Sequence, residues 1–557
     1  PLASLATMTA AGWNLAEIWE RNADRFPDAI AQVCGDRTST WAEFDRRADG
    51  IAAALLAAGA QRQDKVAHYL YNCPEYLESM FGLFKAALVP VNTNYRYSDD
   101  ELVYLWDNAD AVAVIFHGTF ADRCQHLRAR VPGVHTWIWV DDGSGPCPDW
   151  AVPYETAAAF ATGRTVPSWG RSPDDLYLLY TGGTTGMPKG VMWRQDDLFQ
   201  VLGAGGNALL MIPPFETVAE AGVRARTGMA GDMALPPPSS LVVACPLMHG
   251  TAQFGSFGVL NTGGCIISLP SRRFDSCELW DEVHRLRANS ISIVGLAFAQ
   301  PMLEALEANP GRWDLSCITR IGSSGTVWSH ENKQALLTHL PPGAMLMDSL
   351  GSSEAVGLGG STSVAGAEAG TAQFLVGPNS AVFTEDGRRV EAGSGERGLV
   401  AVGGFIPAGY YKDPEKSAKT FRIFEDRRWS VPGDFAEVNA DGTIKLLGRG
   451  SQVVNTGGEK VFPEEVEEAL KTHPQVRDAV VVGIPDARFG EKVCAVVDMG
   501  EAAPLSLADL TAHVKGRLAD YKIPRAMVAA PVVRAANGKV DYKAIRAQAL
   551  EALGVKA

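Results

Sequence analysis

The stretch Leu176-Tyr-Leu-Leu-Tyr180 leads directly into Thr181-Gly-Gly-Thr-Thr-Gly-Met-Pro-Lys-Gly190. The first segment is apolar and aromatic and predicts a buried β-strand. The second combines three threonine hydroxyls, the charge of Lys189 and glycines, which let backbone amides converge on an anion. It is not a Walker A loop, because that motif requires Gly-Lys-Ser/Thr, whereas here proline precedes the lysine and glycine follows it. A strand followed by such a loop predicts a polyphosphate-binding site.

Strands and helices alternate around this loop. Before it, the pattern predicts helices over 15–25, 41–58 and 75–87 and strands over 29–33, 65–70 and 88–91. After it, further strands are predicted over 241–244, 265–269, 291–294 and 318–321. A segment rich in glycine, alanine and proline, 203–240, is interpreted as an insertion. The alternation is typical of α/β layers around a largely parallel sheet.

The C-terminal part of the chain has a different pattern. Short β segments dominate from 381 to 447, and glycines at 448 and 450 indicate a boundary. The last hundred or so residues predict a compact α+β domain with helices over 463–471 and 507–519 and strands over 476–484 and 492–499. A chain of 557 residues is too long to fold around one hydrophobic core, so we expect two domains, 8–448 and 449–557. Met8 is expected to be the natural start.

Composition excludes several function classes. The formal net charge of −14 argues against a general nucleic-acid-binding protein, which needs a basic face. No apolar run reaches the roughly 18–20 residues of a transmembrane helix. The nine cysteines are scattered without a CxxC pair, so neither a zinc site nor a thioredoxin-like site is predicted, and their odd number in a long chain favours free thiols. We therefore expect a cytoplasmic enzyme with free thiols.

Further motifs follow in the order of one known superfamily. They are Pro246-Leu-Met-His249-Gly250, Ser323-Ser-Gly-Thr-Val-Trp328, Asp348-Ser-Leu-Gly-Ser-Ser-Glu354, Val431-Pro-Gly-Asp434, Gly448-Arg449, Gly457-Gly-Glu-Lys460-Val-Phe-Pro463 and Asn537-Gly-Lys539-Val540. With the Gly/Thr loop they resemble the acyl- and aryl-CoA synthetase, adenylation-domain and luciferase (ANL) superfamily over essentially 13–543. The resemblance implies a large N-terminal body of layered α/β subdomains with a small β-rich subdomain, followed by a small mobile α+β lid.

The resemblance also implies roles for individual residues. Lys539 would bridge the carboxylate and the α-phosphate, Glu354 and Thr185 would hold Mg2+, and His249 would border the acyl channel as a further catalytic residue. Ser451 would be the hinge of the lid, and Gly457, Gly458 and Lys460 would border CoA. The residues expected to bind ATP or AMP are Thr181, Gly182, Gly183, Thr184, Gly186, Lys189, Ser324, Gly325, Thr326, Asp348, Ser349, Leu350, Gly351, Ser353, Asp434 and Arg449.

Four positions depart from the superfamily pattern, and two of them, Ser353 and Pro432, stand in the place of a threonine. Leu350 replaces a tyrosine, which removes an aromatic wall beside the nucleotide or the acyl group, so the pattern does not predict the shape of the pocket there. Ser451 replaces the usual aspartate or lysine of the hinge, although a small polar residue can still absorb a change in φ and ψ.

The implied activity is ATP-dependent formation of an acyl-adenylate and then of an acyl-CoA thioester, with ATP, Mg2+ and CoA. The chain is similar to actinobacterial fatty-acyl-CoA synthetases, particularly the branch acting on steroid side chains. A steroid or other bulky hydrophobic acid is therefore favoured, and a medium- or long-chain fatty acid is the alternative. A carrier-protein-loading enzyme, a luciferase-like oxygenase, a catalytically silent binding protein and a Walker-type ATPase are further alternatives. The oligomeric state, including a homodimer, stays open.

Overall fold

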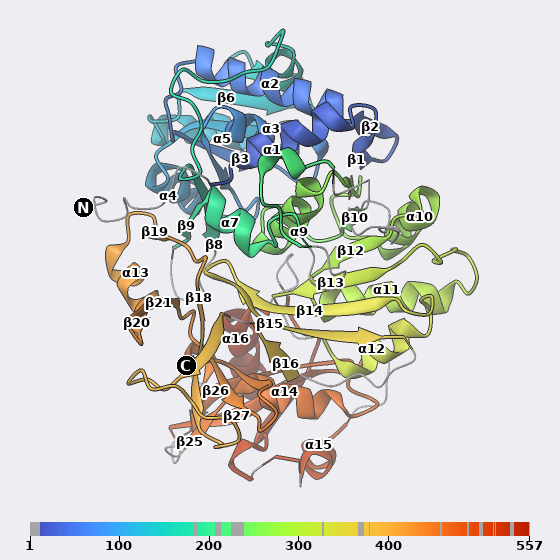
Figure 1. The fold of residues 1–557 in the computed structure, drawn as a ribbon. Helices are drawn as coiled ribbons and strands as arrows, with labels where there is room; N and C mark the ends of the chain where they lie inside the picture. Colours follow the sequence, from blue (N-terminus) through green and yellow to red (C-terminus); the bar gives the residue numbers. More distant parts are fainter. Residues whose placement is uncertain are drawn as a thin grey trace. The chain divides into compact units, whose positions relative to one another are not determined.

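The structure, a computed structural model, describes residues 12–181, 187–206, 213–223, 239–325, 328–365, 373–377, 379–456, 459–486, 490–500, 505–515, 517–518, 520–534 and 540–555. The chain divides into two compact units, whose elements Figure 1 labels. Unit 1 comprises Pro1–Ile293, Trp313–Ile318 and Phe405–Lys419, and unit 2 comprises Val294–Arg312, Thr319–Gly404 and Thr420–Ala557. The α/β class predicted from the sequence is confirmed. The domain boundary at 448/449 stays a prediction.

One sheet of unit 1 contains the strand that precedes the Gly/Thr loop. Its order is β19-β9-β8-β4-β3-β5-β6-β7. All pairings from β8 to β7 are parallel, whereas β9 runs antiparallel to both β8 and β19. The strands are β3 (Lys65–Tyr69), β4 (Val89–Asn92), β5 (Ala111–His117), β6 (Thr136–Val140), β7 (Val152–Pro153), β8 (Leu176–Thr181), β9 (Lys189–Arg194) and β19 (Gly409–Tyr410).

The remaining strands of unit 1 follow the order β2-β1-β11-β10-β12. They are β1 (Ile30–Cys34), β2 (Arg37–Thr40), β10 (Ser240–Val243), β11 (Cys265–Ser268) and β12 (Ser290–Ile293). The helices are α1 (Leu15–Arg25), α2 (Trp41–Ala57), α3 (Pro74–Lys85), α4 (Asp99–Asn108), α5 (Ala121–Leu127), α6 (Tyr154–Ala158), α7 (Gln195–Val201), α9 (Gly250–Asn261), α10 (Ser276–Leu286) and α13 (Pro414–Thr420).

Local sequence explains where several of these helices begin. The Asn14 side chain accepts a hydrogen bond from the Ala16 backbone N–H at 3.0 Å and caps α1. At α4, Ser98 and Glu101 form a capping box. Each cap satisfies backbone N–H groups that the first turn of a helix leaves without an internal partner.

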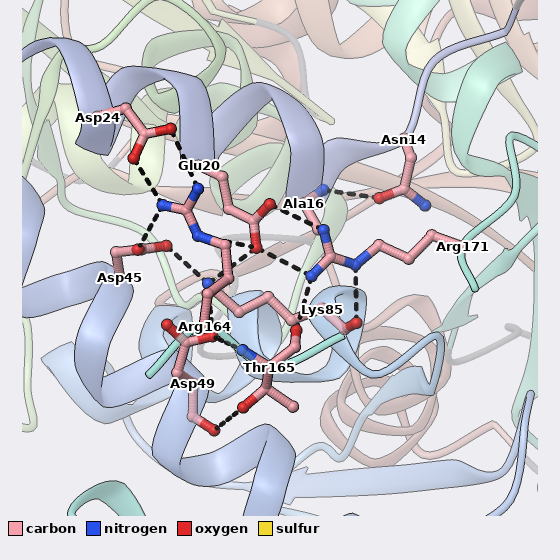
Figure 2. A network of polar contacts seen from close by, with 10 residues as sticks. All are labelled: Asn14, Ala16, Glu20, Asp24, Asp45, Asp49, Lys85, Arg164, Thr165 and Arg171. Atoms are coloured by element: carbon pink, nitrogen blue, oxygen red, sulfur yellow. Dashed lines mark hydrogen bonds and ion pairs between the residues drawn. The ribbon is translucent and has the colours of Figure 1, made fainter. Parts of the chain in front are cut away.

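Helices α1, α2 and α3 enclose a network of buried charges (Figure 2). The fully buried ammonium of Lys85 lies 2.9 Å from Glu20, 2.7 Å from Asp45 and 2.8 Å from Asp49. Arg171 donates to both carboxylate oxygens of Glu20. Burial is tolerated because each carboxylate has a cationic partner.

Unit 2 contains two groups of strands. The first follows the order β13-β14-β15-β16-β23-β22-β18-β21-β20, with β17 beside β18. Its strands are β13 (Arg320–Ser324), β14 (Met345–Ser352), β15 (Ala355–Val364), β16 (Gln373–Val376), β17 (Ser380–Phe383), β18 (Arg397–Gly403), β20 (Phe421–Phe424), β21 (Arg427–Ser430), β22 (Asp434–Val438) and β23 (Ile444–Arg449). The β-rich segment predicted over 381–447 is confirmed by β17 to β23.

The second sheet belongs to the C-terminal part. Its order is β25-β24-β27-β26, with β28 beside β27. The strands are β24 (Val454–Thr456), β25 (Glu459–Val461), β26 (Asp478–Asp486), β27 (Gly490–Asp498) and β28 (Ala526–Ala529). The helices of unit 2 are α11 (Leu296–Ala308), α12 (His330–Leu337), α14 (Pro463–Lys471), α15 (Leu507–Val514) and α16 (Tyr542–Leu553).

The helix predicted over 507–519 is wrong at its C-terminal end. Helix α15 ends at Val514, and Lys515 adopts extended backbone angles of φ −63° and ψ 129°. Glycine follows at 516, and glycine is favoured just beyond a helix end. Among the described residues, no helix combines the length and the apolar character that crossing a membrane would require.

Candidate active site

The Gly/Thr loop joins two adjacent strands of unit 1. Thr181 at the end of β8 stands opposite Lys189 at the start of β9. A Cβ atom on Gly190 would lie 2.7 Å from the Tyr180 ring, so this position requires glycine. Gly182, Gly183, Thr184, Thr185 and Gly186 lie outside the described residues.

Asn92, at the end of β4, fixes the strand that enters this loop. Its side chain accepts from the Tyr180 N–H at 2.6 Å and donates to the Tyr180 carbonyl at 2.8 Å. It also donates to the Met248 carbonyl at 2.6 Å, one residue before His249. Asn92 is 6% exposed. The sequence analysis missed it, although a polar residue that ends a buried strand is a usable signal.

Lys189 forms an ion pair with Asp413, which follows β19. The ammonium of Lys189 and the backbone N–H of Lys416 hold the pKa of the Asp413 carboxyl below its ordinary value. The same carboxylate accepts from the Lys416 N–H at 2.9 Å, in the first turn of α13. Asp413 was also missed. The pair holds the lysine side chain at the edge of the loop.

His249 is the N-cap residue of α9 and is half-buried. Gln253 in the first turn donates to the Leu247 carbonyl at 2.6 Å and accepts from the Tyr177 hydroxyl at 2.6 Å. These bonds fix the start of the helix. Further along α9, a Cβ atom on Gly258 would meet no heavy atom of the described residues within 4 Å, so that part of the chain leaves space beside the helix there.

In unit 2, strands β13 and β14 bring two predicted nucleotide segments side by side. They pair in parallel, with Ser323 opposite Asp348 and Ser324 opposite Ser349. Gly325 follows at φ +91°, a conformation that favours glycine. Thr326 lies outside the described residues.

The segment 348–354 runs along β14 into a hairpin with β15. Ser349, Leu350 and Gly351 belong to β14, and Ser353 and Glu354 form the two-residue turn between paired Ser352 and Ala355. The hydroxyl of fully buried Ser430 donates to the Glu354 carbonyl at 2.6 Å. Ser430 was missed because it lies 76 residues away in the chain. The turn is therefore anchored to β21.

Asp348 is buried against Lys333 of α12, and their side chains form an ion pair. Burial raises the pKa of the Asp348 carboxyl above its ordinary value, and Lys333 opposes that shift. Lys333 was not predicted, since no motif marks it. It lies on a short helix where a lysine would ordinarily face solvent.

Asp434 begins β22 and stands directly opposite Arg449, which ends β23. Gly433 at φ +103° and Gly448 at φ +111° flank the pair. Beyond it, Ser451 lies in a short 3-10 helix, Gly450–Gln452. The structure thus brings together the two residues expected at the ribose, although the side chain of Arg449 is outside the described atoms.

The motifs of the C-terminal part are only partly described. Lys460 lies on β25 opposite Asn455 of β24, and its backbone alone is described. Gly457, Gly458 and Lys539 lie outside the described residues. The described site residues thus fall into two groups: Thr181, Lys189 and His249 in unit 1, and Ser324, Gly325, Asp348, Ser349, Leu350, Gly351, Ser353, Glu354, Asp434, Arg449, Ser451 and Lys460 in unit 2.

Comparison with known proteins agrees with the motifs. A family model described as "AMP-binding enzyme" matches residues 19–411, and one described as "AMP-binding enzyme C-terminal domain" matches residues 465–539. The medium/long-chain-fatty-acid–CoA/3-oxocholest-4-en-26-oate–CoA ligase of Mycobacterium tuberculosis is 39% identical over 538 residues, covering 96% of each chain. The 3-oxocholest-4-en-26-oate–CoA ligase of Rhodococcus rhodochrous is 40% identical over 546 residues, covering 95% of each chain.

The fold also matches solved structures. The anthranilate CoA ligase AuaEII, in complex with anthranoyl-AMP, superposes with a TM-score of 0.83 over 98% of this chain and 99% of its own. At 21% identity this likeness concerns the fold alone. The family models and the two ligases extend over most of the chain, and the chain belongs to the family of AMP-binding enzymes.

Proposed function

We propose that the protein is an AMP-forming acid–thiol ligase. It converts an acid and ATP into an acyl-adenylate and pyrophosphate, and then transfers the acyl group to the thiol of CoA, releasing AMP. The observation that carries the proposal is the identity of 39–40%, over at least 95% of both chains, to relatives named as CoA ligases. The motif residues retained from Thr181 to Lys539 support it.

The first step needs little acid–base chemistry, because a carboxylate is already ionised at neutral pH. Its oxygen attacks the α-phosphorus of ATP, a phosphorus–oxygen bond to pyrophosphate breaks, and pyrophosphate leaves. Negative charge grows at the α-phosphate during this step, and fixed positive charge lowers its energy most effectively in a dry site. We assign that charge to Lys189 and Lys539, and nucleotide positioning to Asp434 and Arg449.

Mg2+ fits the oxygen donors of this chain. No group of three or more His, Cys, Asp or Glu side chains able to hold a metal ion occurs among the described residues. Mg2+ often uses only one or two protein carboxylates together with the phosphates of a nucleotide. Glu354, with the Thr185 hydroxyl, would hold the ion, which would neutralise phosphate charge.

The second step places the CoA thiol next to the carbonyl carbon of the adenylate. Sulfur forms the new bond to this carbon, the bond from the carbon to the AMP oxygen breaks, and the thiol proton passes to solvent. We assign the CoA-bordering loop to Gly457, Gly458 and Lys460. The lid would turn about Ser451 between the two steps, so that Lys539 serves the first step and this loop the second.

For the acid we propose a steroid side-chain acid or another bulky hydrophobic acid. The names of the relatives support this class, and the mycobacterial names equally support medium- and long-chain fatty acids as the alternative. The open space beside Gly258 on α9 supports a bulky acyl group. All nine cysteines are free thiols, which suits the reducing cytoplasm where we place the enzyme.

The decisive experiment measures AMP release from ATP and Mg2+ across a panel of acids, with and without CoA. The panel runs from acetate through long fatty acids to aromatic and steroid side-chain acids. Sustained AMP release that requires both CoA and one class of acid is expected, with the acyl-CoA identified by mass spectrometry. ADP as product, or sustained turnover that needs no CoA, would overturn the proposal.

A further inference from the structure

Lys333 lies buried between two segments of unit 2 that are expected to contact the nucleotide. Helix α12 begins just after the segment that ends at Trp328. The Lys333 ammonium pairs with Asp348, at the start of the second segment, and only 5% and 9% of the two side chains are exposed. The ammonium also lies 6.0 Å from the centre of the Trp328 ring, within reach of a cation–π contact. One lysine therefore contacts both segments.

The surroundings of Lys333 are rigid. The Trp328 indole N–H donates to Asn332 Oδ1 at 2.6 Å, and the Asn332 amide donates to Gln300 Oε1 of α11 at 3.0 Å. Asn332 precedes Lys333 on α12, so these bonds fix the turn that carries the lysine. Ser323 stands opposite Asp348 in the paired strands, so the backbone that carries the carboxylate is held by the sheet.

The charges around the pair come from helix α12 itself and from helix α14. Glu468 of α14 acts electrostatically on both Asp348 and Lys333. Glu331 of α12 and Lys471 of α14 act in turn on Glu468. Lys333 is the cation that offsets the negative charge of Asp348, and Glu468 adds negative charge. Without Lys333, Asp348 would be a buried carboxyl group whose charged form is disfavoured.

We propose that Lys333 is a positioning residue for the nucleotide, holding the Asp348 carboxylate in place and balancing its charge. This inference rests on the proposed function and assigns a role to a residue that no motif marks. An ionised carboxylate can only accept hydrogen bonds. The phosphates of ATP offer no donors, so the partner of Asp348 is an N–H or O–H group of the base or ribose.

The test is equilibrium binding of AMP, and of ATP with Mg2+, to the full chain in the absence of any acid substrate. In Lys333→Met, the dissociation constant for AMP is expected to rise about tenfold to a hundredfold at pH 7, the effect of losing a hydrogen bond to a charged group. The loss should shrink towards pH 9, because Asp348 without its partner ionises only at higher pH. Lys333→Arg keeps the charge and should keep most of the affinity.

A double variant separates binding from folding. Lys333→Met alone leaves a buried carboxyl group unpaired and is expected to lower the thermal midpoint, whereas Lys333→Met/Asp348→Asn removes both charges and should recover it. The double variant should bind AMP more weakly than the wild type at every pH, because it has no carboxylate to ionise. Folded variants with wild-type affinity would overturn the inference. Wild-type protein that binds neither nucleotide would instead contradict the proposed function.

Discussion

Lys189 and Asp413 form an ion pair although 224 residues separate them in the chain. The pair connects the end of the Gly/Thr loop to the start of α13, where Asp413 also accepts from the Lys416 backbone N–H. Asp413 thus keeps the lysine near the loop and stabilises a helix end. Both side chains are partly exposed, 38% for Lys189 and 29% for Asp413, so the ion pair is accessible to solvent.

Replacing Lys189 should weaken nucleotide use with little effect on stability. We expect Lys189→Met to lower kcat/KM for ATP about tenfold to a hundredfold, because a charge-assisted contact to phosphate is lost. The thermal midpoint should change little, since a partly exposed ion pair contributes about 0–1 kcal/mol. Steady-state AMP release and calorimetry on the same samples measure the two effects.

Asp413→Asn is the matched control for this prediction. Asparagine can still accept from the Lys416 N–H and leaves the charge of Lys189 in place. Its kcat/KM for ATP should therefore stay much closer to the wild-type value. Equal losses in Lys189→Met and Asp413→Asn would mean that the ion pair itself is needed, and that Lys189 has no separate role at the nucleotide.

Glu354 offers a second prediction. Removing its charge in Glu354→Gln should lower AMP formation by about 100-fold to 1,000-fold, comparable to the loss of a main electrostatic group in an active site. The Mg2+ concentration needed for half-maximal activity should rise as well. A titration of Mg2+ at saturating ATP measures both. An unchanged Mg2+ requirement in this variant would exclude Glu354 as the ligand.

Ser430→Ala tests the anchor of the Glu354 turn. The variant removes one hydrogen bond to the Glu354 carbonyl and keeps the carboxylate. A typical hydrogen bond contributes about 1 kcal/mol, so activity should fall no more than about tenfold. A loss as large as that of Glu354→Gln would show that the anchoring of the turn, rather than the carboxylate charge, controls the step.

The sequence predicts the elements of this protein better than its side-chain contacts. The helix predicted over 463–471 matches α14, whose start is marked by a proline. The strand predicted over 176–180 matches β8 to within one residue, because an apolar run ends shortly before a glycine there. Strand β26 begins two residues later than predicted, at Asp478, where register with β27 decides the boundary. Pairing across strands depends on tertiary structure that periodicity does not encode.

The candidate site shows the same division. Motif order could place Asp434 and Arg449 in one site, and the register of β22 and β23 supplies their direct opposition. The contacts of Asn92 and Ser430 were not predictable, because each joins segments far apart in the chain. Lys333 is closer in sequence to Asp348, but no motif marks it and helical pattern alone does not bury it. The roles of all the site residues stay predictions, and Lys539, Gly457 and Gly458 also lie outside the described part of the structure.

The buried network around Lys85 gives a stability prediction. Lys85→Met would leave the carboxylates of Glu20, Asp45 and Asp49 without their shared ammonium (Figure 2). Removing one partner of a buried ion pair typically costs about 3–5 kcal/mol, so unit 1 should unfold at a much lower temperature. Lys419→Met, which removes one charge from an exposed pair with Glu415, should have almost no effect in the same calorimetric experiment. Similar midpoints for both variants would contradict this.

His68 makes stability depend on pH. Its ring is fully buried, Nε2 lies 2.8 Å from the Ser79 hydroxyl oxygen, and burial lowers the pKa of His68 from 6.5 to about 3. The folded state therefore keeps the ring neutral while the unfolded state takes up a proton below pH 6.5. This contribution is fully present above pH 6.5 and is lost as the pH falls towards 3, by about 1.4 kcal/mol per pH unit.

The His68→Gln variant tests that slope. It should be less stable than the wild type at pH 7.5, because the buried contact changes, but should lose less stability between pH 6.5 and pH 5. His117, whose pKa burial also lowers, to about 4, leaves part of the slope in place. His135→Gln, at an exposed position, is the control and should follow the wild-type curve. Parallel curves for His68→Gln and the wild type would refute the assignment.

Gly258 allows the proposed acid class to be tested without changing the chemistry of the reaction. Glycine inside a helix destabilises it by about 1 kcal/mol relative to alanine, so a glycine in α9 calls for a physical reason. Gly264, which follows the end of α9, has one in the fold: a Cβ atom there would lie 2.3 Å from the Ser239 carbonyl. At Gly258 the same atom would meet nothing within 4 Å among the described residues, so packing against that part of the chain does not explain the glycine. An acyl group lying against this face of α9 would explain the glycine.

Gly258→Leu should therefore fold at least as stably as the wild type and select against bulk. We expect kcat/KM for a steroid side-chain acid to fall at least about tenfold relative to that for hexanoate, since a few misplaced methylene groups in an apolar pocket cost about 1–3 kcal/mol. Ala57→Leu, which adds the same side chain at an exposed position of α2, should leave this ratio unchanged. If Gly258→Leu kept the wild-type ratio of kcat/KM for the two acids, the acyl group would have to lie elsewhere. Gly258 would then be no argument for a bulky substrate. If kcat/KM fell equally for both acids while the thermal midpoint stayed unchanged, even a short acyl chain would lie against α9. That result would favour the fatty-acid alternative.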